Sequence, residues 1–252
     1  MMTQHSAQSH SSARLAWLSA VLFGVVAPWA AMLLLDARAG DGPIIPLGGP
    51  ILAVGLMGVG MIGAAAAASV RIGVLCALLN GAGLLGLGWA LGLPLLAHPL
   101  PCALAMIIAS LSFAVRGALF ARSAGDKGWW IAVFVVTGEV AILATAMALP
   151  AALPAWLLVL LPAQWASVSI QTALAGTPII AAGAALAALA GTAAATHLVA
   201  SLWPRRWPYL VMFTAWLCFS ALVWHYPAPP VDGASPAAPA VDQPGKPAPE
   251  RS

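Results

Sequence analysis

Apolar stretches of about 20 residues, joined by short links, occupy most of this chain. A helix needs about 20 mainly apolar residues to cross the hydrocarbon core of a bilayer. The sequence contains eight stretches that approach this length. They cover residues 15–35, 47–69, 72–93, 100–121, 129–149, 154–174, 177–200 and 207–226. This pattern predicts an all-α polytopic transmembrane bundle of about eight helices.

The composition supports a membrane protein and excludes a nucleic-acid binder. Of the 252 residues, 62% are hydrophobic and only 7% are charged, and the mean hydropathy is +0.96. Too few charged side chains are present to cover a surface that faces water. The net charge of +3 comes from only 10 Lys and Arg residues, which cannot form the dense basic face that nucleic acid requires. The expected partner is therefore the lipid bilayer.

The two ends differ from the apolar region between them. Residues 1–13 are polar, and we expect a disordered cytoplasmic N-terminus there. Residues 14–226 form the predicted transmembrane domain. Residues 227–252 are rich in Pro and Ala and lack an apolar face, which is typical of a disordered tail. Such a tail is also suited to docking on another protein.

The positions of Lys and Arg predict the orientation, because cytoplasmic links carry an excess of both. With eight crossings, most of them lie inside when both termini are cytoplasmic, so Ser6 and Ser235 are expected inside and His98 outside. Compactness and this charge asymmetry favour a bacterial-type inner membrane. Arg205 and Arg206 contradict the eight-crossing model, because it places them outside. A re-entrant segment late in the chain, giving seven crossings, is the alternative.

Small residues predict which helices lie inside the bundle. Gly60 and Ala64 have the four-residue spacing that lets two membrane helices approach closely. Gly88 and Gly92 repeat this spacing in the next stretch. We therefore expect residues 47–69 and 72–93 to form interior helices.

Glu139 is the residue that most needs an explanation. It lies near the centre of the run GWWIAVFVVTGEVAILATAMALP, where an ionisable group is costly unless it is satisfied by partners or has a function. If residues 150–154 form a turn between antiparallel helices, the depth of Glu139 is matched near Gln164 or Trp165. The sequence therefore predicts a partner for Glu139 in the segment 154–174.

Other polar residues fall at similar depths. Gln164, Ser167 and Gln171 follow the i, i+3, i+7 spacing of one helix face. Asn80 lies near the middle of its own stretch. Ser110, Ser112 and Thr214 do so as well. Together they predict a polar layer at the membrane midplane, centred on Glu139.

Two interpretations of this layer remain open. In the first, Glu139 is interhelical glue: a protonated carboxyl donates to Gln164, and the chain is a non-catalytic membrane subunit or assembly factor of a larger complex. In the second, Glu139 binds and releases a proton during transport of a small solute. Arg116 is expected to extend toward the cytoplasmic interface, away from Glu139.

Evidence for metal, cofactor or catalytic chemistry is weak. His98 and His197 are both expected near the outer face and are the best candidates for metal or haem ligands, but neither has another ligand close in sequence. Cys76, Cys102 and Cys218 are widely separated and resemble buried apolar residues. The sequence contains no G-x-S-x-G, H-E-x-x-H or P-loop motif. Gly81, Gly83 and Gly86 match the G-x-G-x-x-G pattern of dinucleotide-binding loops, but they lie inside an apolar stretch and do not follow a strand, so the match is interpreted as accidental. We therefore expect no cofactor, and an enzyme is the least favoured class.

Overall fold

The computed structural model of the chain describes residues 2–39, 45–91, 99–149, 152–202 and 208–228. These residues are almost entirely helical and include no strand, so the all-α bundle is confirmed. Two long helices begin the chain, and each is interrupted by a π-helical turn. The first consists of α1 (Met2–Val21), the π-helical turn η1 (Leu22–Val26) and α2 (Ala27–Ala39). The second consists of α3 (Ile45–Met57), the π-helical turn η2 (Gly58–Ile62) and α4 (Gly63–Ala67). The remaining elements are α5 (Val70–Ala90), α6 (Pro99–Ala124), η3 (Gly125–Lys127), α7 (Gly128–Ala148), α8 (Ala155–Val159), α9 (Pro162–Leu174), η4 (Ile179–Ala182), α10 (Gly183–Leu202) and α11 (Pro208–His225).

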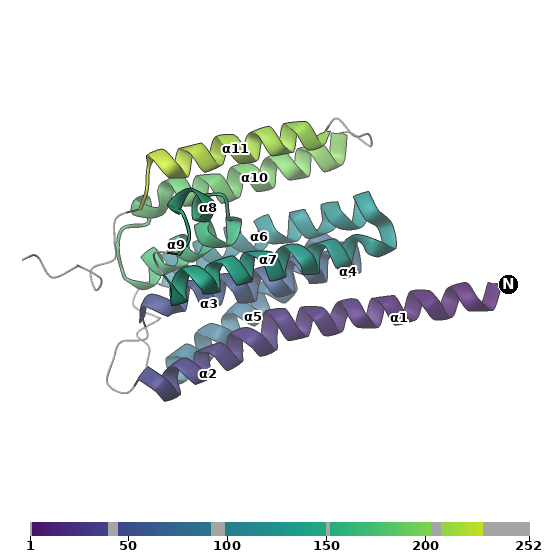
Figure 1. Cartoon of the computed structure of the whole chain (residues 1–252), viewed down its shortest axis with the longest axis horizontal. Helices are drawn as coiled ribbons and strands as arrows, with labels where there is room; N and C mark the ends of the chain where they lie inside the picture. Colours follow the sequence, from purple (N-terminus) through teal and green to yellow (C-terminus); the bar gives the residue numbers. More distant parts are fainter. Residues whose placement is uncertain (1, 40–44, 92–98, 150–151, 203–207, 229–252) are drawn as a thin grey trace, which may run out of the picture.

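Helices of membrane-spanning length account for most of the described chain. By length and hydropathy, five stretches qualify: Ser12–Ala37, Gly48–Ala67, Val70–Ala90, Pro99–Ala148 and Ile180–Ser201. The stretch Pro99–Ala148 combines α6 and α7, which run in opposite directions on either side of η3 (Figure 1). A shorter apolar helix covers Leu210–His225. These helices make the chain a multi-pass membrane protein.

Local backbone signals explain where the helices stop. Ala68 adopts the left-handed conformation with φ of 47° and ends α4. The Ser69 hydroxyl then accepts a hydrogen bond from the Ile72 N–H at 3.5 Å and begins α5. Gly125, with φ of 56°, supplies the corresponding reversal between α6 and α7. Both reversals lie at the same end of the bundle as the N-terminus (Figure 1).

The sixth predicted segment departs from a simple crossing. In Figure 1, α7 ends and α10 begins at the same end of the bundle, opposite the N-terminus. The pair α8 and α9 lies between them in sequence, so it enters and leaves the bundle at that one end. The last helix, α11, ends there as well. This arrangement fits the alternative of seven crossings and one re-entrant pair.

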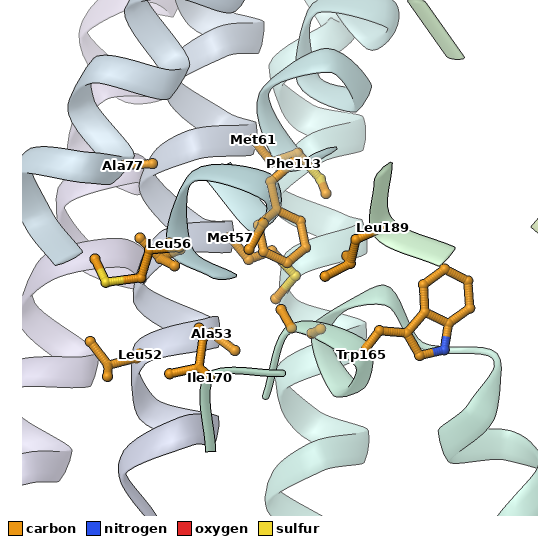
Figure 2. Close-up of a cluster of buried hydrophobic side chains, with 14 of the residues drawn as sticks. Leu52, Ala53, Leu56, Met57, Met61, Ala77, Phe113, Trp165, Ile170 and Leu189 are labelled. Carbon is orange, nitrogen blue, oxygen red and sulfur yellow. The ribbon is translucent and has the colours of Figure 1, made fainter. Parts of the chain in front are cut away.

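The core of the bundle is formed by α3, η2, α6 and α9. Leu52, Leu56 and Met57 of α3 belong to this core. Met57 lies beside Phe113 of α6, and Ala53 lies beside Ile170 of α9 (Figure 2). The interior position predicted for residues 47–69 is therefore confirmed. The same prediction for residues 72–93 is wrong, because α5 lies at the periphery and exposes apolar side chains such as Leu75 and Leu79.

Glycines allow two close helix crossings in this core. A Cβ atom on Gly58 of η2 would lie 2.7 Å from Gly24 Cα in η1, so the two π-helical turns pack backbone against backbone. A Cβ atom on Gly117 of α6 would overlap the carbonyl oxygen of Met61 and lie 3.0 Å from Met61 Cα. These positions explain why the bundle needs glycine at its centre.

Candidate functional site

The α8–α9 pair is a helix broken inside the bundle. Proline at position 154 precedes α8, and α8 ends at Val159. Leu161 is extended, with φ of −91° and ψ of 118°, and Pro162 begins α9. Proline suits the first position of a helix because its missing N–H would have no partner there. The sequence therefore starts a new helix at Pro162 instead of continuing α8.

Two carbonyl oxygens that the end of α8 leaves without a helical partner accept hydrogen bonds from tryptophan side chains. The indole Nε1 of Trp165 donates to the Val159 carbonyl oxygen at 2.7 Å. The indole Nε1 of Trp216, from α11, donates to the Leu160 carbonyl oxygen at 3.1 Å. A broken helix at membrane depth requires such partners, because lipid cannot satisfy its backbone groups.

The N-terminal end of α9 is held by Glu139. This side chain projects from the middle of α7 and is buried, with 8% of its surface exposed. Its Oε2 atom accepts a hydrogen bond from the backbone N–H of Ala163 at 2.9 Å. Leu161, the residue that precedes α9, provides no side-chain cap. Glu139 therefore caps α9 from a neighbouring helix, where the helix dipole favours negative charge.

The partner of Glu139 is close to the predicted position but differs in kind. Gln164 was expected to bind the carboxyl, and the observed partner is the backbone of its neighbour Ala163. The reason is the helix break, which leaves the Ala163 N–H without a partner inside α9. This N–H is available only because α9 begins at Pro162.

Arg116 of α6 faces the same region. Its Nη2 atom donates to the Thr192 hydroxyl oxygen on α10 at 3.0 Å. Its Nη1 atom is buried and has no hydrogen-bond partner. The guanidinium and the Glu139 carboxylate interact electrostatically. The expectation that Arg116 extends away from Glu139 is therefore wrong, because Thr192 holds the guanidinium inside the bundle.

A cavity of about 250 Å³ lies between these groups. Arg116 and Glu139 line it together with Pro162, Thr192, Thr196 and Trp216. Among the lining residues in the described part of the chain, only Arg116 and Glu139 carry charge, and their charges are opposite. The cavity is therefore neutral overall when both groups are ionised.

A second cavity, of about 550 Å³, lies on the other side of the helix break. Most of its polar lining comes from the predicted face of α9, namely Gln164, Ser167 and Gln171, together with Thr172 and with Tyr226 after α11. Leu158, Val159 and Trp165 also line this cavity, whereas Leu160, Leu161 and Pro162 line the smaller one. The junction between α8 and α9, residues 158–162, thus separates the two cavities and forms the wall between them.

The other predicted polar residues lie elsewhere. Gln171 Oε1 accepts a hydrogen bond from the Gly49 N–H on α3 at 2.8 Å. Asn80 of α5 donates to the Gly24 carbonyl oxygen at 2.8 Å and accepts from Trp29 Nε1 at 3.3 Å. The hydroxyl groups of Ser110 and Ser112 are buried without a hydrogen-bond partner. The predicted layer is therefore divided among separate places, and only part of it surrounds Glu139.

Comparison of the chain with protein-family models, with curated proteins and with solved structures gave no match. The geometry of the two cavities and of the α8–α9 pair is therefore the basis for a function.

The structure describes only one of the two candidate metal ligands. His197 of α10 is exposed, and His98 lies outside the described residues. Among the described residues, no cluster of three or more His, Cys, Asp or Glu side chains is arranged to hold a metal ion.

Two residues of the site were missed in the sequence. Thr192 and Trp216 lie far from Glu139 in the chain and within ordinary apolar stretches. The four-residue spacing of Thr192 and Thr196 places both hydroxyl groups on one face of α10 and was a usable signal. No comparable signal distinguishes Trp216 from the other tryptophans.

Proposed function

We propose that the protein carries a small solute across a bacterial-type inner membrane, with the α8–α9 pair as the gate and Glu139 as its proton-binding group. The observation that supports this proposal most is the hydrogen bond from Ala163 to Glu139 at the wall between two cavities. Half-helix ends near the bilayer midplane form the solute and ion sites of many carriers.

The charge on Glu139 controls the gate in this proposal. The ionised carboxylate caps α9 and balances Arg116, which keeps the wall between the cavities in place. A protonated carboxyl is a weaker acceptor and carries no charge to balance Arg116. Proton binding therefore loosens α9, and proton release closes it again.

A second candidate is a non-catalytic membrane subunit or assembly factor. The observation that favours it is that the same groups connect four helices: Glu139 joins α7 to α9, and Arg116 joins α6 to α10. In that role Glu139 is interhelical glue, and its protonation has no functional consequence.

The response of cavity accessibility to pH distinguishes these functions without knowledge of the solute. In a background without Cys76, Cys102 and Cys218, we expect a cysteine at Ser167 to react with N-ethylmaleimide at a rate that changes several-fold as the pH falls. Ser167 is buried and lines the larger cavity, so its labelling reports the gate. Part of this change is the intrinsic effect of pH on any thiol, and the rest reports the gate. In the Glu139→Gln background, where the side chain cannot ionise, we expect only the intrinsic effect to remain.

An exposed cysteine at Ser123 provides the control, since its rate gives the intrinsic effect of pH on a thiol. Identical pH profiles for the Ser167 and Ser123 positions in both backgrounds would contradict the gate and favour the subunit function.

For the orientation we propose a cytoplasmic N-terminus and seven crossings. The end of the bundle that holds the N-terminus then also holds the links that follow α4, α6 and α10. Its Lys and Arg residues are Arg14, Arg71, Arg122, Lys127, Arg205 and Arg206. The short links at the other end contain only Arg38. Seven crossings also place Lys246 and Arg251 on that side, but they follow His225 by 21 and 26 residues, beyond the distance from a membrane helix at which Lys and Arg set the orientation. Seven crossings therefore remove the exception that Arg205 and Arg206 made, as the positive-inside rule requires.

Cysteine labelling tests this orientation. We expect Ser6→Cys to react with a membrane-impermeant maleimide only from the cytoplasmic side, and Ser235→Cys only from the opposite side. The reason is that an odd number of crossings separates the two positions. Labelling of both positions from one side would support eight crossings and contradict the re-entrant α8–α9 pair.

A further inference from the structure

We propose that the smaller cavity binds one small monovalent anion, which enters together with a proton on Glu139. This inference rests on the proposed carrier function and names its class of solute. The cavity already holds an anion, the Glu139 carboxylate, which is bound by the Ala163 N–H and balanced by Arg116. The side chain thus occupies the place that the solute takes.

Arg116 provides the second argument for an anion. Its Nη2 atom binds Thr192, but its Nη1 atom is buried without a partner and can donate. A buried donor without an acceptor is costly, and a bound anion would satisfy it. The Ala163 N–H and the Nη1 group therefore form a pair of donors once Glu139 has moved away.

Charge balance couples the anion to the proton. With Glu139 ionised, the cavity has one positive and one negative group, and an added anion would leave a net negative charge in a medium of low dielectric constant. One proton on the Glu139 carboxylate removes its charge and frees the Ala163 N–H. One monovalent anion then restores neutrality, so the expected ratio is one proton per anion.

The size of the cavity and its single cation limit the anion. A volume of about 250 Å³ admits ions such as nitrate, chloride or a short carboxylate. A divalent anion of similar size would exceed the charge of Arg116, the only cation in the lining. The site therefore selects by charge as well as by size.

The other charged groups near α7 lie toward its first residue. In the described chain, the segments α3, η2, α4 and α9 pack against α7 and contain no titratable side chain. The segments α1, α6 and η3 also contact α7 and include titratable residues other than Arg116: His5, His10 and Arg14 on α1, Cys102 and Arg122 on α6, and Asp126 and Lys127 on η3. Asp126 and Lys127 precede Gly128, and Glu139 lies 11 residues further along α7, or about 16 Å at 1.5 Å per residue. Cys102 lies near the first residue of α6, at the opposite end of that helix from Arg122. The helices α10 and α11, which also line the cavity, contain His197, Cys218 and His225, and none of these is among the lining residues. The proton responsible for coupling therefore binds Glu139.

Nitrate binding to the purified full chain in lipid nanodiscs tests the proposal. Calorimetric titration with potassium nitrate, at fixed ionic strength, should show one site in the wild type at acidic pH. Above the titration of Glu139, the affinity should fall roughly tenfold per pH unit, because one proton is linked to one anion. Potassium sulfate should not compete with nitrate at matched ionic strength.

Two variants separate the site from its titration. Glu139→Gln should bind nitrate with an affinity that no longer depends on pH. The double variant Arg116→Gln with Glu139→Gln keeps the cavity neutral and should bind at least tenfold more weakly than Glu139→Gln. Nitrate binding that is equal in all three proteins, or absent from Glu139→Gln in its folded form, would overturn the inference.

A vesicle assay distinguishes failure of this inference from failure of the carrier function. Proteoliposomes with an inward potassium nitrate gradient should take up protons in the wild type and not in Glu139→Gln. Nitrate binding without proton uptake would support the anion site and contradict the carrier. A pH-dependent gate in the Ser167 labelling assay without nitrate binding would support the carrier and overturn the anion site.

Discussion

Replacing Arg116 with leucine is expected to destabilise the folded protein by about 3 to 5 kcal/mol, because it leaves a buried charge without its partner. Glu139 is buried, and its Oε2 atom would retain only the hydrogen bond from Ala163. Thr192 would also lose the donor that joins α10 to α6. Unfolding in mixed micelles with increasing sodium dodecyl sulfate, followed by circular dichroism, measures the change.

The double variant Arg116→Leu with Glu139→Leu is the matched control. It removes both charges and leaves an apolar cavity, so most of the lost stability should return. Equal destabilisation by the single and double variants would show that the two charges do not stabilise one another. It would also remove the basis for coupling a proton to an anion at this site.

Replacing Gly117 with leucine is expected to cost about 3 kcal/mol or more, since the new side chain cannot be accommodated without moving two helices. Even a Cβ atom at this position would overlap the Met61 carbonyl oxygen and lie 2.9 Å from its carbonyl carbon. Both obstructing atoms belong to the backbone of η2, so a change of side-chain rotamer cannot relieve the overlap. The same denaturation experiment measures the loss.

Gly138→Ala is the comparison for this prediction. Gly138 lies on α7 beside Glu139, and no atom of a packing neighbour lies within 4 Å of the position that a Cβ atom would occupy. We expect this variant to be as stable as the wild type or slightly more stable, because alanine favours the helix. If Gly117→Leu were as stable as Gly138→Ala, the close crossing of α6 and η2 would be incorrect.

The helices were predictable from the sequence because their signal is local. A run of about 20 apolar residues in a bilayer forms a helix, because a helix satisfies its own backbone hydrogen bonds. Each of the eight predicted stretches overlaps a helical segment of the structure. The path of the sixth stretch was not predictable in the same way. Its length of 21 residues is sufficient for a crossing, and a proline such as Pro162 is compatible both with a kinked helix and with the start of a new one.

The site was predictable in its position and not in its chemistry. Helical rise placed the partner of Glu139 near Gln164, one residue from Ala163. The identity of that partner depends on a backbone N–H that a continuous helix would have used internally. The prediction for Arg116 was wrong because a long side chain near a helix end can reach water, whereas a hydrogen bond to Thr192, 76 residues later in the chain, keeps its guanidinium inside the bundle.

The hydrogen bond from Trp216 to the Leu160 carbonyl oxygen affects the order in which the protein can assemble in the membrane. Trp216 follows Leu160 by 56 residues, so the ribosome makes the broken segment well before its partner exists. During that interval α8 and α9 have an unsatisfied carbonyl group that lipid cannot bind. The broken segment can therefore reach its final conformation only after α10 and the first half of α11 have been synthesised. The arrival of α11 in the membrane therefore completes an element that was made much earlier.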